Sequence, residues 1–107
     1  MQVIQRFDNV ANRNDGTAAI SGGTAVTAIT ATTKGRQAIQ ICNHSLYDIW
    51  LMFTERSASA PTISSTSKDG VIPAGTDKTI GAGDGVAVWL ISADASNTAA
   101  FTAVELR

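Results

Sequence analysis

The fold of this chain is decided first by residues 35–54, which read GRQAIQICNHSLYDIWLMFT. Side chains alternate in the first half of this stretch, so that Ile39 and Ile41 fall on one face of an extended chain and Arg36 falls on the other. Alternation with a period of two is typical of a strand with one buried face. The pattern therefore predicts a half-buried β-strand at 36–42, with its isoleucines in the core.

A polar turn and a second strand follow. Residues 43–45 are Asn-His-Ser, and Asn and Ser side chains favour turns because they bond to nearby backbone groups. Residues 46–54 are rich in β-branched and aromatic side chains, which favours a strand. The second face of this strand carries Leu46, Trp50 and Met52, and a face in contact with water rarely holds three such groups. The strand is predicted to be central in a sandwich or to lie at a subunit contact.

Further strands are indicated along the rest of the chain by alternation or by short apolar runs between turn residues. They are expected at 24–32, 70–72, 77–80, 85–93 and 99–106, with a helix as the alternative at 24–32. The polar segment 55–70 is predicted to be a long exposed loop, and the glycine-rich segment 81–85 a hairpin turn. Segment 8–23 is rich in Asn, Asp and Gly and is predicted to be a loop or an extended arm.

These elements predict an all-β fold. Seven or eight short strands without a clear helix are typical of a single antiparallel β-sandwich, here a jelly roll or another Greek-key arrangement. The predicted organisation is an N-terminal arm or edge strand plus loop at 1–23, followed by the sandwich at 24–107. Residues 1–7 alternate as an edge strand would, and Val3, Ile4 and Phe7 are predicted to contact a neighbouring subunit.

Composition excludes several classes of partner. Charged residues make up 16% of the 107 residues, and the eight basic residues are scattered, whereas binding of nucleic acid requires clustered Lys and Arg. The first ten residues contain no apolar run long enough for a signal peptide, and no segment approaches the ~20 apolar residues of a membrane span. We expect synthesis in the cytoplasm without signal-directed export, and no membrane partner.

No motif with catalytic or cofactor chemistry stands out. Cys42 and His44 are the only cysteine and the only histidine, and two ligands are too few for zinc. A catalytic Cys–His pair also needs a third group to orient the histidine, and none is evident here. Both residues are therefore predicted to be structural. The glycines of 81–85 lack the Gly-Lys-Ser/Thr of a phosphate-binding loop. We therefore expect a protein that is not an enzyme and binds no cofactor or metal.

The order of the motifs resembles a family of small β-sandwich proteins found in the virions of tailed bacteriophages. The first shared features are an Ala/Thr-rich strand, a basic residue opening a strand that ends in Asn, a small polar turn, and a strand of alternating aliphatic and aromatic residues ending in Phe. A polar loop, an apolar turn with glycine, a buried strand ending in Ile-Ser-Ala and a last strand ending near Glu follow. The features fall here on 24–32, 36–43, Ser45, 49–53, 70–75, 86–93 and 101–105, so that the resemblance covers 22–107. This chain departs from the pattern in having Gly35 before Arg36, where paired basic residues are usual, and in the bulky side chains at 50–52.

The resemblance implies a non-enzymatic virion component, such as a capsid decoration protein, a head-fibre base or an adaptor. It also implies a symmetric homo-oligomer, with a trimer favoured, that docks on capsid or tail proteins. The interface residues predicted on this basis are those of the arm together with Leu46, Trp50 and Met52; ordinary core packing is the alternative for the last two. A second hypothesis is a carbohydrate-binding or receptor-binding module, with Tyr47 or Trp50 stacking on sugar rings and Asp48 or Asn43 bonding to hydroxyls.

Overall fold

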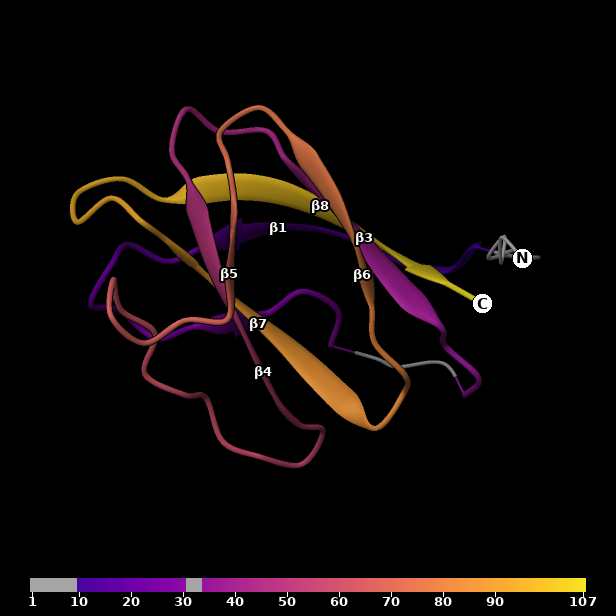
Figure 1. Cartoon of the computed structure of the whole chain (residues 1–107). Helices are drawn as coiled ribbons and strands as arrows, with labels where there is room; N and C mark the ends of the chain where they lie inside the picture. Colours follow the sequence, from indigo (N-terminus) through magenta and orange to yellow (C-terminus); the bar gives the residue numbers. More distant parts are fainter. Residues whose placement is uncertain (1–9, 31–33) are drawn as a thin grey trace, which may run out of the picture.

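The computed structural model describes residues 10–30 and 34–107, and the predicted arm contacts Val3, Ile4 and Phe7 lie outside these residues. The described part is built from strands joined by loops (Figure 1). Its eight strands are β1 (Val10–Ala18), β2 (Val26–Thr27), β3 (Ala38–Asn43), β4 (Ile49–Glu55), β5 (Gly70–Ile72), β6 (Asp77–Gly81), β7 (Val86–Ser92) and β8 (Ala99–Leu106). The predicted all-β fold is confirmed.

The strands form two four-stranded antiparallel sheets. Sheet I has the order β1-β8-β3-β6, and sheet II has the order β2-β7-β4-β5. Apart from β4 and β5, consecutive strands always lie in different sheets, so the chain crosses repeatedly between the two layers. Two four-stranded sheets connected in this way form a jelly roll, in which long-range pairing replaces local hairpins.

The two strands of the 35–54 stretch do not pair with each other. Strand β3 pairs with β8 and β6 in sheet I, whereas β4 pairs with β7 and β5 in sheet II. The polar turn between them carries the chain from one sheet to the other. The hairpin predicted at 81–85 is wrong for the same reason, because this turn connects β6 of sheet I to β7 of sheet II.

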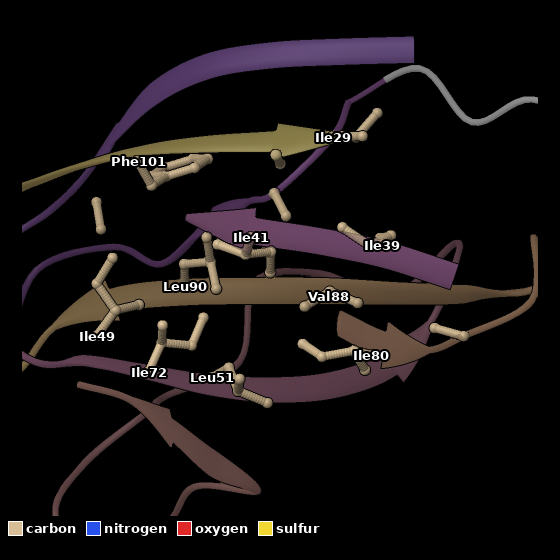
Figure 2. Close-up of a cluster of buried hydrophobic side chains, with 14 of the residues drawn as sticks. Ile29, Ile39, Ile41, Ile49, Leu51, Ile72, Ile80, Val88, Leu90 and Phe101 are labelled. Atoms are coloured by element: carbon tan, nitrogen blue, oxygen red, sulfur yellow. The ribbon is translucent and has the colours of Figure 1, made fainter. Parts of the chain in front are cut away.

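The core lies between the sheets, where the alternating apolar side chains of both layers meet (Figure 2). Strand β3 contributes Ile39 and Ile41, with exposed fractions of 1% and 0%, as its alternation predicted. Strands β4 and β7 contribute residues of the same kind from sheet II. The largest fully buried side chains of this core are Ile39, Ile41, Ile49, Leu51, Ile72 and Leu90.

One N-terminal prediction is wrong and a second is confirmed only in part. Segment 8–23 was expected to be a loop or an extended arm, but β1 occupies its middle and pairs with β8 along almost its whole length. Strand β1 lies at the edge of sheet I, where its outer face and its unpaired edge are in contact with water. Polar side chains are compatible with such a position, so the low hydrophobicity of this segment did not prevent a strand. Within the described residues 24–30, the strand predicted for 24–32 is confirmed only as the two residues of β2. The Ala28 N–H still bonds to the Val88 carbonyl of β7, and Ala28 and Ile29 enter the core.

Candidate functional site

The sandwich end that carries the β3–β4 loop is the most organised surface in the described part of the chain. Asn43, at the end of β3, is 2% exposed, and its Nδ2 donates hydrogen bonds to the carbonyls of Tyr47 (2.7 Å) and Ile72 (3.0 Å). Its Oδ1 accepts hydrogen bonds from the backbone N–H (3.0 Å) and the hydroxyl (2.7 Å) of Ser45. The predicted turn is confirmed, and one buried amide fixes its shape.

Neighbouring loops are tied to this turn by backbone hydrogen bonds. The N–H of Ala93 donates to the carbonyl of Asp48 (2.8 Å), and the N–H of Ala74 donates to the Asp48 carboxylate (3.1 Å). The N–H of Ser21 donates to the carbonyl of Asp94 (2.9 Å). Four separate loops, at 19–25, 44–48, 73–76 and 93–98, are thereby joined into one rigid end, which we call the loop platform.

Leu46 projects from the loop platform. Its side chain is 87% exposed, the highest value among the exposed large hydrophobic residues of the described chain. Strand β4 begins only at Ile49, so Leu46 does not share a strand face with Trp50 as the alternation had predicted. A large apolar side chain held in water is a candidate contact for another apolar surface, and hydrogen bonds to the loop backbone reduce the backbone entropy that binding would cost.

A shallow open depression of about 280 Å³ lies beside this leucine and is lined by Leu46, Tyr47, Asp48, Ala93 and Asp94. Backbone hydrogen bonding from Ser96, followed by the side-chain amide of Asn97, lowers the pKa of Asp94 below its ordinary value of 3.8. Its carboxylate is therefore a stable negative charge at neutral pH. The sequence prediction did not include Ala93 and Asp94, since residues almost 50 positions apart meet here only through the fold.

Trp50 and Met52 lie elsewhere, on the outer face of sheet II. Together with Trp89 they are half-buried and pack against a second apolar cluster of Ala25, Ile63 and Ile91. Ile63 comes from the long 56–69 loop, which lies over this face, and Lys68 of the same loop places its ammonium 5.6 Å from the centre of a Trp50 ring. Both residues are thus packed within the chain, but under the 56–69 loop and not in the core between the sheets, where the alternative had placed them.

His44 belongs to a polar chain on the other sheet. Its Nε2 lies 2.8 Å from the Thr102 hydroxyl, and this hydroxyl donates a 2.6 Å hydrogen bond to the Asp15 carboxylate. Since the hydroxyl proton points to Asp15, Thr102 accepts from a protonated Nε2 of His44. A Ser-His-Asp triad places the imidazole between hydroxyl and carboxylate, whereas here the hydroxyl is in the middle, so the order of the groups differs from that of a triad. This chain of groups links β1, β8 and the β3–β4 loop.

Arg36, which was predicted to lie on the outer face of its strand, is 4% exposed. Strand β3 starts two residues later, so the strand alternation does not extend to this position. The guanidinium donates hydrogen bonds to the carbonyls of Ala82 (2.9 Å), Gly83 (2.5 Å) and Val86, and it forms an ion pair with Glu105. This group holds the β6–β7 turn to the end of sheet I and is structural.

Comparison with known proteins identifies no relative: no protein-family model, no curated protein and no solved structure matches the chain. Within residues 10–30 and 34–107, no group of three or more His, Cys, Asp or Glu side chains is arranged to hold a metal ion. The same residues include no helix with the length and hydropathy to cross a membrane.

Proposed function

We propose that this protein is a non-enzymatic structural component of a tailed-phage virion, which docks on a capsid or tail surface as a symmetric oligomer, with a trimer favoured. The role is that of a decoration protein or an adaptor. The observation that carries the proposal is the strand order of the two sheets, which is the jelly-roll arrangement used by many viral capsid proteins. This support is an analogy of fold, and it agrees with the motif order of the 22–107 resemblance.

The loop platform supports the same role and gives it a surface. Its four loops contain no lysine or arginine, while Asp48 and Asp94 flank the exposed Leu46. Two copies meeting through this end by a twofold axis would bring carboxylates of equal charge together, which is unfavourable. The platform is therefore better suited to a different protein surface, with an apolar pocket bordered by basic residues, than to a second copy of itself.

In this proposal the subunits of the oligomer associate elsewhere, and residues 1–9 remain our candidate for the exchanged arm, added as a strand to a neighbour. Light scattering on the purified chain tests this part. We expect a mass about three times that of the 11.1 kDa chain, and a lower mass when residues 1–9 are deleted. The deletion stops before β1, so that the sandwich keeps its edge strand. A monomer in both samples would contradict oligomerisation through the arm.

Attachment to the particle is tested separately, by cosedimentation with phage heads or tails that lack this protein. We expect Leu46→Ser to weaken attachment by roughly tenfold or more, as loss of an interface centre does. Thr98→Ser is the matched control, because Thr98 is exposed on the same platform and does not line the depression. Failure of the unchanged protein to attach to any such particle would contradict the virion role.

A binding module for carbohydrate is a second candidate, favoured by one observation. Tyr47 is half-exposed and lines the depression with Asp48, which offers an aromatic ring and a carboxylate side by side. The other residues of that hypothesis do not fit, since the Asn43 amide is buried and engaged and Trp50 lies under the 56–69 loop. A glycan array followed by Tyr47→Ala tests it; binding lost in this variant would support the module, and no binding to any glycan would contradict it.

A further inference from the structure

The 56–69 loop is unusual because it is long and is held to the sandwich by few contacts. It connects β4 to β5, which among the eight described strands are the only consecutive pair in the same sheet. Such a pair needs only a short hairpin connection, and loops beyond about 12 residues without regular structure are usually functional. Most residues of this loop are exposed, and its sequence, RSASAPTISSTSKD, contains few large apolar side chains.

Backbone hydrogen bonds attach this loop only at its two ends. Among the described residues, Arg56 donates its N–H to the carbonyl of Gly85, and Asp69 donates its N–H to the carbonyl of Leu51. Next to the first end, the N–H of Ala58 donates to the carbonyl of Glu55, the last residue of β4. The other hydrogen bonds between the two ends stay inside the loop: Ser64 and Ser67 bond to each other, and the Lys68 ammonium donates to the carbonyl of Ser65. The middle of the loop has no described hydrogen bond to either sheet.

One apolar side chain anchors the middle, and the Lys68 ammonium lies 5.6 Å from the centre of a Trp50 ring. Ile63 is 3% exposed and packs into the second apolar cluster, whereas its neighbour Thr62 is exposed. The face beneath is made of Trp50, Met52 and Trp89. Two tryptophans and a methionine are the kinds of side chain enriched at the centres of protein interfaces. Opening a segment that has few buried contacts requires less free energy than unfolding the whole domain.

We propose that the 56–69 loop is a detachable cover over this aromatic face, and that it opens while the jelly roll stays folded. The core between the sheets contains no residue of the loop, so opening leaves the main core intact. Closed, the loop shields an apolar surface from water; open, it exposes a surface with the chemistry of an interface. The proposal does not depend on the virion role.

Tryptophan fluorescence reports directly on this face, because Trp50 and Trp89 are the only two tryptophans in the chain. In the unchanged protein, we expect quenching by acrylamide to increase at urea concentrations below those at which the β-sheet circular dichroism is lost. If the loop opens alone, the rise in quenching occurs at a lower urea concentration than the loss of the circular dichroism signal. Coincident transitions would overturn the proposal, since the loop would then unfold only with the sandwich.

Substitution of the anchor provides the second test. We expect Ile63→Ser to raise the acrylamide quenching constant by about twofold or more and to bind an apolar dye, with the β-sheet spectrum retained. Thr62→Ser is the matched control and should change neither signal. If Ile63→Ser does not fold, residues 57–67 are replaced by a short Gly-Ser linker. A folded, strongly quenched protein then supports the proposal, and a second failure to fold overturns it.

Discussion

The guanidinium of Arg36 and the carboxylate of Glu105 form an ion pair at 3.5 Å between side chains that are 1% and 0% exposed. The two residues are 69 positions apart in the sequence, and the pairing of β3 with β8 brings them together. The second oxygen of the Glu105 carboxylate accepts a 3.2 Å hydrogen bond from the Asn12 side chain of β1. One buried carboxylate thus links an edge strand, a central strand and, through Arg36, the β6–β7 turn.

Removing this carboxylate is expected to destabilise the fold strongly. Glu105→Leu leaves a buried cation without its partner, and we expect the free energy of unfolding to fall by about 3–5 kcal/mol. Urea unfolding measures the change. Glu55→Leu is the control, because Glu55 lies exposed at the end of β4 and its replacement should alter stability by no more than about 0.5 kcal/mol. Equal effects in the two variants would contradict a structural role for the ion pair.

The β3–β4 loop is expected to depend on Asn43. Asn43→Ala removes the amide donor to the buried Ile72 carbonyl and one of two donors to the Tyr47 carbonyl, and we expect a loss of about 1–3 kcal/mol in the free energy of unfolding. Thermal or urea unfolding provides the measurement. Asn97→Ala is a suitable comparison, because this amide is exposed, and its effect should be smaller. A negligible effect of Asn43→Ala would show that other contacts hold the loop.

The carboxyl group of Asp94 should titrate below its ordinary pKa of 3.8, because the Ser96 N–H and the Asn97 amide bond to its charged form. The pKa in the folded state is depressed, so the associated stabilisation is present above the unfolded value and disappears as the pH falls through the folded value. An NMR titration of this carboxyl group gives its pKa directly. Asn97→Ala should raise the pKa only part of the way, since the backbone donors remain; an unshifted titration in the unchanged protein would contradict this geometry.

Gly16 is expected to be required by its contact with Phe101. A Cβ added at Gly16 would lie 2.7 Å from Cζ of the Phe101 ring, which is 2% exposed and has little room to move. Gly16→Ala should therefore destabilise the protein by about 1–3 kcal/mol through overpacking. Gly81→Ala is the matched control, because Gly81 also lies in an edge strand and a Cβ there meets no atom within 4 Å. The measurement is urea unfolding of both variants, and equal stabilities would contradict the overpacking argument.

The local pattern of the sequence was enough to predict that most of these strands exist. Alternation placed Ile39 and Ile41 in the core, and the apolar run at 85–93 and the closing segment at 99–106 correspond to β7 and β8. The long loop at 55–70 was also predicted. Each of these features depends on neighbours in the sequence, because the period of side chains along a strand is a local property of the backbone.

The partners of the strands were decided only by the tertiary structure. Nothing local distinguishes a turn that closes a hairpin from one that crosses between sheets, so the pairing of β3 with β8 and of β4 with β7 was not predicted. The burial of Arg36 and the meeting of Leu46 with Asp94 follow from those pairings. The sequence by itself determined most of the strands and their apolar faces, but not β1 or the short extent of β2. Only the packing of the two sheets determined which groups meet, because these contacts join residues far apart in the chain.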